Sequence, residues 1–165
     1  MKGNSSSKQA DYFHNLGWEA RKRQEFKKAI EFYNQAIELN SQHFKAYFNR
    51  GFAYDRTGDI ESAIRDYSKA LEIDPNNAYC YYNRGISEDK RGNIEEALDN
   101  FTMAIEIDSS KADFFSNRGF AFRKMQKYGE ALSDYSRSIK LNPSKLWLMQ
   151  TTSEPTTIEH YATRS

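Results

Sequence analysis

The chain has 165 residues, 28% of them charged, yet its formal net charge at pH 7 is only +1. This length predicts about one domain, and the balanced charge argues against a protein that works on phosphate backbones. No apolar run reaches the roughly 18 residues of a membrane span, and residues 1–9 lack the apolar core of a signal peptide. We therefore expect neither nucleic acid nor a membrane as a partner, and a cytoplasmic location, with the nucleus and the cilium as alternatives.

The sequence lacks the patterns of catalytic and metal-binding sites. The single cysteine, Cys80, cannot form an internal disulfide, which favours a reducing compartment. The histidines His14, His43 and His160 do not have the spacing of a zinc site, and there is no glycine-rich phosphate loop. We expect a protein that is not an enzyme and that uses no cofactor or metal.

A period of 34 residues organises most of the sequence. Glycine, alanine and an aromatic residue each recur at one phase of this period, in four successive copies. The recurring residues are Gly17, Gly51, Gly85 and Gly119; Ala29, Ala63, Ala97 and Ala131; and Tyr33, Tyr67, Phe101 and Tyr135. The copies span residues 10–43, 44–77, 78–111 and 112–145, and their phases are numbered from 1 to 34. A repeat of this length predicts a stacked array of small units.

In chain order, the polar residues 1–9 predict a disordered lead-in, in which Ser7 is a candidate cap for the first helix. Each repeat then predicts two helices with apolar residues at helical spacing. In the second repeat Gly58 and Asp59 separate these helices, and Asp59 is expected to cap the later one. Pro75 is expected to end it.

The repeat pattern fails after Pro143. We expect residues 146–165 to form a short cap stub, with Trp147 and Leu148 against the last helix, and then a disordered tail. Solenoids usually end in a helix with a polar outer face. The array therefore has the pattern of a fragment or splice form of a longer array, and a self-sufficient protein of four repeats is the alternative.

The recurring residues resemble the tetratricopeptide repeat. In the second copy the residues that match its pattern are Tyr47, Gly51, Ala63, Tyr67 and Pro75. The resemblance covers residues 10–143 and implies an all-α fold, a right-handed superhelical solenoid of four helix–turn–helix repeats. It also implies that the first helices of the repeats line a concave groove. The small residues at phases 8 and 20 are expected to let the two helices of a repeat approach closely.

Phases 7 and 23 change their chemistry together. The pairs are Leu16 with Phe32, Arg50 with Asp66, Arg84 with Asn100, and Arg118 with Asp134. We therefore expect phase 7 of the first helix to contact phase 23 of the second, so that these arginines are structural. Glu88 replaces a phase-11 tyrosine, and we expect it to pair with Arg84 one turn earlier.

Phase 6 carries an asparagine in every repeat. These residues are Asn15, Asn49, Asn83 and Asn117. The row resembles the asparagine ladder in the repeat array of the O-linked N-acetylglucosamine transferase family. That resemblance implies a groove whose side-chain amides pair with the backbone of a bound segment. The alternative is that each asparagine bonds to a neighbouring helix.

Aromatic and basic side chains surround this row in the predicted groove. The aromatic candidates for apolar anchors are Phe48, Phe52, Tyr82 and Phe120, and the basic candidates for charge steering are Arg56, Lys90 and Lys124. Other residues at the same phases are His14, Trp18, Ile86 and Lys22. For each ring, packing between adjacent repeats is the alternative.

A comparison with chaperone-binding tetratricopeptide domains is negative. Those domains hold a C-terminal carboxylate with lysine at phase 5 and asparagine at phase 9, where the first repeat here has His14 and Trp18 and the second has Phe48 and Phe52. We therefore do not expect the chain to bind the C-terminal tails of heat-shock chaperones.

The sequence predicts an adaptor or scaffold that binds an extended or helical segment of another protein in the concave groove. The first alternative is a substrate-selecting arm, or a truncated isoform, of a larger enzyme such as a protein O-glycosyltransferase. The second is self-association through the incompletely capped C-terminal end.

Overall fold

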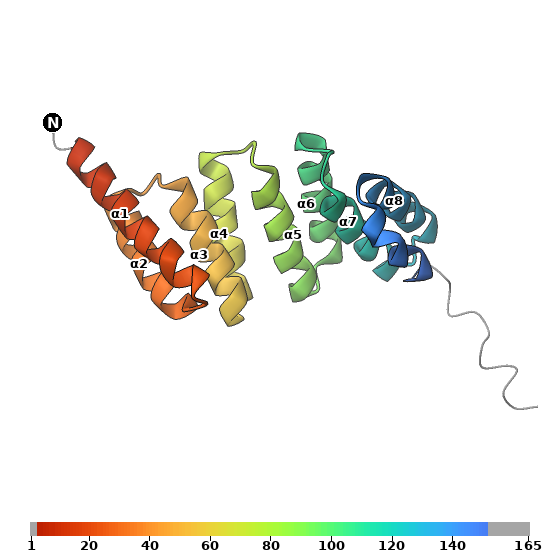
Figure 1. Ribbon diagram of the computed structural model, residues 1–165, viewed down its shortest axis with the longest axis horizontal. Coiled ribbons are helices and arrows are strands. Elements are labelled where there is room, and N and C mark those ends of the chain that lie inside the picture. Colours follow the sequence, from red (N-terminus) through yellow and green to blue (C-terminus); the bar gives the residue numbers. More distant parts are fainter. Residues whose placement is uncertain (1–2, 152–165) are drawn as a thin grey trace, which may run out of the picture. The chain divides into compact units, whose positions relative to one another are not determined.

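The computed structural model describes residues 3–151, and every regular element within them is helical (Figure 1). In chain order the elements are α1 (Gly3–Lys22), α2 (Phe26–Leu39), α3 (Phe44–Thr57), α4 (Ile60–Ile73), α5 (Ala78–Arg91), α6 (Ile94–Ile107), α7 (Ala112–Lys124), α8 (Tyr128–Leu141) and the 3₁₀ helix η1 (Pro143–Thr151). The all-α prediction and the two helices in each repeat are confirmed. No helix in the described range is both long and apolar enough to cross a membrane.

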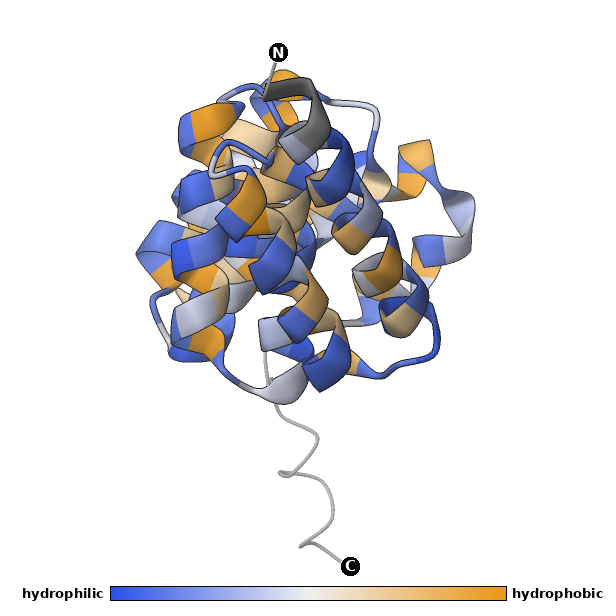
Figure 2. Ribbon diagram, turned by 90° about the vertical axis from the view of Figure 1, so that its left-hand side faces the viewer, coloured by the Kyte–Doolittle hydropathy of each residue, from blue (hydrophilic) through white to orange (hydrophobic). Residues whose placement is uncertain are grey.

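The chain divides into two compact units, Met1–Asp108 and Ser109–Ser165. The first unit contains α1 to α6, which are the helix pairs of the first three repeats. The second unit contains the pair α7 and α8, followed by η1. Hydrophobic and hydrophilic residues alternate along the individual helices, as expected for helices with one buried face (Figure 2).

Small residues bring the two helices of a repeat close together. A Cβ atom at Gly51 of α3 would lie 3.0 Å from the ring of Tyr67 and 3.3 Å from the carbonyl oxygen of Ala63, both in α4. Ala63 and Tyr67 are fully buried, and Tyr47 belongs to the same core cluster. The predicted close approach at these phases is confirmed.

The alanine at phase 27 of the second repeat, Ala70, leaves room for the next repeat. Ala70 of α4 and Cys80 of α5 are fully buried in one apolar cluster. The Cys80 thiol donates a hydrogen bond to the backbone oxygen of Tyr67 at 3.4 Å, and burial raises the pKa of Cys80 to about 12. The thiol is therefore a packing group and not a reactive one.

The predicted contact between phases 7 and 23 is present in every repeat that has a polar pair. Arg50 donates two hydrogen bonds of 2.7 Å to the carboxylate of Asp66, and a third of 2.7 Å to Asn34 of the preceding repeat. Arg118 and Asp134 form the same bidentate pair at 2.7 and 2.9 Å. The arginines thus tie the first helix of a repeat to the second, which confirms their structural role.

Glu88 forms an ion pair, but not with the predicted partner. Its carboxylate accepts from Arg91 at 2.8 Å and from Asn93 at 3.2 Å, and only 6% of the residue is exposed. The prediction of Arg84 is wrong because that guanidinium is turned toward α6, where it donates to Asn100 at 2.8 Å. The phase 7–23 contact therefore takes precedence over pairing within the helix.

The loop between α3 and α4 places its cap where the sequence predicts it, whereas α2, α6 and α8 begin without a side-chain cap. Asp59 accepts a hydrogen bond from the backbone N–H of Ser62 at 3.1 Å, which caps α4. Gly58 ends α3 with a φ of 88°, a left-handed conformation that favours glycine. Asn77 caps α5 through the N–H of Cys80 at 3.0 Å.

The amino-terminal end differs from the expectation. Helix α1 begins at Gly3, so Ser7 lies inside it and does not cap it. The Ser6 hydroxyl donates to the backbone oxygen of Leu39 at 2.8 Å, and Ala10 is fully buried. Contacts with α2 thus support a helical first turn that the polar composition of residues 1–9 does not reveal.

The segment after α8 folds as η1 and begins at Pro143, slightly earlier than the predicted stub. Leu148 is fully buried in a cluster with Ala131 and Tyr135 of α8. Trp147 is half exposed, and its ring stacks on Phe120 with centroids 6.0 Å apart. The predicted disordered tail lies outside the described residues.

Replacing Tyr67 by phenylalanine is expected to leave the free energy of unfolding unchanged or to raise it by up to about 1 kcal/mol. The Tyr67 hydroxyl is buried and finds no hydrogen-bond partner among residues 3–151. Phe101 already occupies this phase in the third repeat. Urea unfolding of the Tyr67→Phe variant checks the expectation, and a clear loss of stability would reveal a hydrogen bond to that hydroxyl.

Candidate functional site

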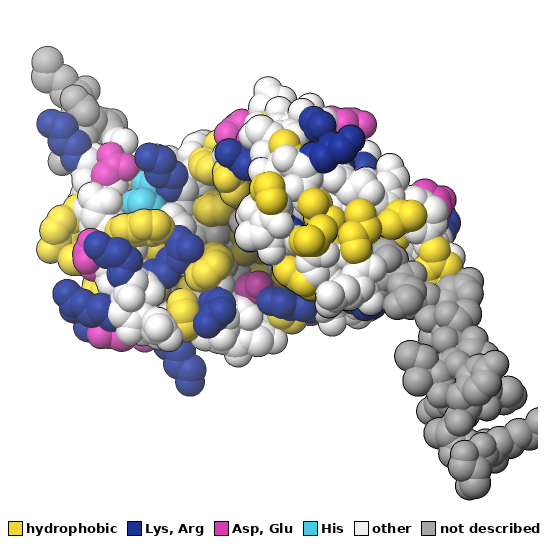
Figure 3. Space-filling model, turned by 45° about the vertical axis from the view of Figure 1, so that its right-hand side comes forward, with side chains coloured by type: hydrophobic (Ala, Val, Ile, Leu, Met, Phe, Trp, Pro, Cys, Tyr) yellow, Lys and Arg dark blue, Asp and Glu magenta, His cyan; other side chains and the backbone are white. Residues whose placement is uncertain are grey.

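The first helices of three successive repeats line an open cavity of about 470 Å³ within the first unit. Aromatic rings and side-chain amides, together with one arginine, form its wall. The lining residues are Trp18 and Arg21 of α1; Phe44, Phe48, Asn49 and Phe52 of α3; and Asn77, Tyr79 and Asn83 at and within α5. Figure 3 shows hydrophobic and basic side chains lying together beside a histidine on the surface next to the amino terminus.

Two of the predicted aromatic anchors, Phe48 and Phe52, line this cavity. The Phe48 ring stacks on Phe44 at 6.0 Å and lies 5.9 Å from Tyr67, and the Phe52 ring lies 6.4 Å from Phe26. Each ring is half-buried, so it contributes both to the core and to the cavity wall. Tyr82 does not line the cavity, and its ring lies 6.0 Å from Phe101.

The asparagines of phase 6 do not behave alike. Asn49 is only 6% exposed, and its carbonyl oxygen accepts from Arg21 at 2.7 Å while its amide nitrogen lies 3.0 Å from Nε2 of His14. Asn83 lines the cavity, and its amide donates to the backbone oxygen of Tyr79 at 2.8 Å. The Asn83 carbonyl oxygen accepts no hydrogen bond from the described part of the chain.

Asn15 lies outside the cavity on an exposed part of α1, with its carbonyl oxygen 3.3 Å from Nδ1 of His14. In the second unit, Asn117 donates from its amide to the backbone oxygen of Asp113 at 2.9 Å. That unit also carries Phe120, whose ring packs between Tyr135 and Trp147.

The predicted basic residues Arg56, Lys90 and Lys124 also differ from one another in their surroundings. Arg56 lies 5.4 Å from the ring centroid of Phe26, whereas Lys90 forms an ion pair of 2.7 Å with Asp55 of the preceding repeat. The charge of Lys90 is thus matched within the protein. Lys124 is an exposed residue at the end of α7 in the second unit.

The sequence prediction missed four residues of the cavity wall, namely Arg21, Phe44, Asn77 and Tyr79. The guanidinium carbon of Arg21 lies 3.9 Å from the ring centroid of Phe52 and 4.8 Å from that of Trp18. Arg21 belongs to phase 12 in the first helix of its repeat, and the tetratricopeptide resemblance places these first helices on the groove. That phase was the signal that could have found it.

A hydrogen-bond network determines the protonation state of His14, which bonds to the cavity residue Asn49. Because the Asn49 carbonyl accepts from Arg21, its amide donates to Nε2 of His14, which must be unprotonated. The His14 ring also stacks on His43 with centroids 5.1 Å apart. Burial, followed by the charge of His43, lowers the pKa of His14 below its ordinary value.

The free energy of unfolding is expected to fall as the pH decreases from about 7 to 5. His14 binds a proton less readily in the folded than in the unfolded chain, so stability from this residue is present above the unfolded pKa and is lost below it. One such group contributes at most about 1.4 kcal/mol per pH unit. Denaturation of wild type and His14→Gln across this range measures the effect, and parallel curves would contradict it.

The described residues contain no group of three or more His, Cys, Asp or Glu side chains arranged to hold a metal ion. The cavity wall presents aromatic surface, amide groups and one arginine. Such a wall is suited to binding a polypeptide segment.

Comparisons with known proteins support the repeat fold. The model described as tetratricopeptide repeat matches residues 44–77, 78–111 and 112–145, and a second model, described as TPR repeat, matches residues 19–58. No curated protein matches the sequence.

Solved structures of similar fold are numerous. One titled as a crystal structure of MamA protein has a TM-score of 0.82 at 21% identity, covering 87% of this chain and 79% of that one. MamA 41-end from Desulfovibrio magneticus RS-1 has a TM-score of 0.81 at 17% identity, covering 87% and 81%. Pseudomonas aeruginosa PilF has a TM-score of 0.79 at 23% identity, covering 90% and 69%.

At these identities the structural likeness shows the fold alone. The family models are more specific, because together they match the sequence from residue 19 to residue 145. Four helix pairs with small residues at the predicted contact phases give the same result. The chain belongs to the tetratricopeptide repeat family.

Proposed function

We propose that the protein is an adaptor or scaffold that binds an extended segment of another protein in the cavity of its first unit. The observation that carries this proposal is the lining of that cavity, in which aromatic rings and side-chain amides come from the first helices of three repeats. A tetratricopeptide scaffold fold is compatible with such a role.

The rings supply the apolar part of binding. Trp18 is 40% exposed and Tyr79 is 50% exposed, although large aromatic side chains are usually more buried. They stand on α1 and α5, with Phe48 and Phe52 of α3 also in the wall. Exposed rings held by a rigid scaffold are typical binding hot spots, since they desolvate at low entropic cost.

The side-chain amides of the asparagines supply the hydrogen bonds to the bound segment. Asn83 offers a carbonyl oxygen to a backbone N–H of the bound segment, an interaction that does not depend on the side chains of that segment. Asn49 is assigned a positioning role, because its hydrogen bonds hold Arg21 and His14. We propose that Asn117 and Phe120 contribute to partner binding on the second unit.

The test is binding of captured partners to purified protein. Partners isolated with wild-type protein are expected to bind a Trp18→Ala, Tyr79→Ala double variant at least tenfold more weakly, because two anchors with an expected cost of 1 kcal/mol or more each are removed. The matched control is Tyr12→Ala, which removes an aromatic residue that is 59% exposed and does not line the cavity.

Equal binding by the double variant and by wild type, with both equally helical, would contradict the proposal. Loss of binding in the Tyr12→Ala control alone would place the working surface elsewhere on the first unit.

A further inference from the structure

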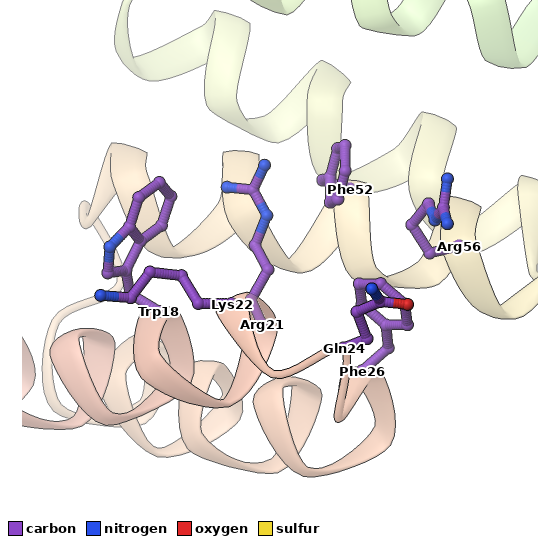
Figure 4. A pocket seen from close by; sticks show the side chains of 7 residues that line it. All are labelled: Trp18, Arg21, Lys22, Gln24, Phe26, Phe52 and Arg56. Atoms are coloured by element: carbon purple, nitrogen blue, oxygen red, sulfur yellow. The ribbon is translucent and has the colours of Figure 1, made fainter.

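A second cavity, of about 310 Å³, lies beside the first and shares part of its wall. It is formed by α1, the start of α2 and α3, all within the first unit. Its lining residues are Trp18, Arg21, Lys22, Gln24, Phe26, Phe52 and Arg56 (Figure 4). Aromatic rings and cations alternate along this wall, and no acidic residue lines it.

Arg21 is held in position without a carboxylate partner. Figure 4 shows its guanidinium rising between Trp18 and Phe52, at the ring distances of 4.8 and 3.9 Å given above. Its hydrogen bond to the carbonyl oxygen of Asn49 uses one of its five N–H donors. Within residues 3–151, neither Arg21 nor Arg56 forms a salt bridge.

The corresponding positions one repeat further along the chain carry residues of opposite charge. Asp55 and Lys90 occupy the positions that correspond to Arg21 and Arg56, one period further along the chain. They form an ion pair of 2.7 Å between neighbouring first helices. Between the first and second repeats the same two positions carry two cations instead of an anion and a cation.

Arg21 is only partly buried, and this desolvation disfavours its charged form and lowers the pKa of the arginine. A partly desolvated charge without a counter-ion is a favourable place for an anion to bind. The planar guanidinium fork matches a carboxylate in a two-bond geometry. The rings of Trp18, Phe26 and Phe52 leave apolar surface beside the arginines for a second side chain.

We propose that this cavity binds the side-chain carboxylate of an acidic residue in a bound peptide segment, together with an adjacent aromatic residue of that segment. Arg21 and Arg56 take the carboxylate between them, at the two positions where Asp55 and Lys90 pair directly in the next repeat, and the neighbouring ring packs against Trp18 and Phe52. This inference rests on the proposed function, since Trp18, Arg21 and Phe52 line both cavities. It specifies that the bound segment contains an acidic residue next to an aromatic residue.

The test uses the capped dipeptide acetyl-Phe-Glu-amide and its neutral analogue acetyl-Phe-Gln-amide as probes. Each is titrated into ¹⁵N-labelled full-length protein while the indole N–H signal of Trp18 is followed. The glutamate probe is expected to bind about tenfold more tightly, because the neutral analogue loses a charge-assisted pair of hydrogen bonds. Added salt is expected to reduce the difference.

Two variants test whether Arg21 and Arg56 bind the carboxylate of the probe. Arg56→Gln removes an exposed cation and is expected to abolish most of the preference for glutamate without unfolding the protein. Arg21→Asp copies the Asp55–Lys90 arrangement, so its new carboxylate is expected to pair with Arg56 and to exclude the probe. Lys27→Asp is the control of equal charge change, since Lys27 is exposed on α2 and lines neither cavity.

Equal affinity for the two probes, or no binding of either, would overturn the inference. So would a Trp18 shift of the same size with inorganic phosphate alone, which would show a general anion site. The proposed function would survive each of these results if captured partners still depended on Trp18 and Tyr79. Loss of that dependence with the glutamate preference intact would refute the proposed function and leave the subsite.

Discussion

Replacing Asp66 by alanine is expected to lower the free energy of unfolding by about 3–5 kcal/mol, the usual cost of leaving one partner of a buried ion pair alone. The Asp66 side chain is 8% exposed and that of Arg50 is 17% exposed. Removing the carboxylate leaves a guanidinium that has lost both of its hydrogen bonds to α4. Chemical denaturation followed by circular dichroism gives the measurement.

The sequence itself supplies the controls for Asp66. Asp66→Asn is expected to cost less, because the third repeat pairs Arg84 with Asn100 at 2.8 Å. The double variant Arg50→Leu, Asp66→Phe copies the residues at phases 7 and 23 of the first repeat and is expected to recover part of the loss. Additive losses from the two single changes would contradict a direct contribution of the pair.

Replacing Gly17 by alanine is expected to lower the free energy of unfolding by about 2–3 kcal/mol, in the range of overpacked cores. A Cβ atom there would lie 2.5 Å from the Tyr33 ring, and this ring is fully buried between the helices. At an open helical position the same change would be favourable, because alanine has the higher helix propensity. Thermal or urea unfolding determines the sign.

Gly129→Ala is the matched control for Gly17. Gly129 is also helical, but no atom lies within 4 Å of the position of its Cβ. Alanine there is expected to be neutral or to stabilise by up to about 1 kcal/mol. If both substitutions stabilised the protein, the close approach of α1 and α2 at phase 8 would be refuted.

The repeat period predicted the parts of the fold that depend on phase alone. Gly51 faces Ala63 and Tyr67, and Arg50 meets its phase-23 partner, because each of these contacts lies within one 34-residue unit and recurs in other copies. Such contacts can be inferred from the pattern of paired changes between copies.

Contacts that do not follow from phase alone were harder to predict. The early start of α1 depends on Ser6 reaching the last turn of α2, and a polar, serine-rich stretch does not indicate this. The partner of Glu88 depended on a competition for Arg84 between two possible contacts, which was decided by Asn100 of the facing helix. Both outcomes follow from packing in three dimensions.

The site was predicted as a uniform row, and the structure shows it as differentiated positions. Asn49 and Asn83 share a phase, but only Asn49 has a cationic neighbour in the preceding repeat to bond with. The phase of Arg21 indicates a position on the groove, but the placement of its guanidinium between the rings of Trp18 and Phe52 is visible only in the structure. A single phase label does not carry this information.

Site-specific photo-crosslinking is the most direct test of the cavity as the working surface. A photoreactive residue placed at position 79, on the cavity wall, and another at position 12, outside it, would be compared in cell extract. Crosslinks from position 79 to one contiguous partner segment, containing an acidic residue beside an aromatic one, are the predicted result. Crosslinks from position 12 alone, with none from position 79, would contradict it.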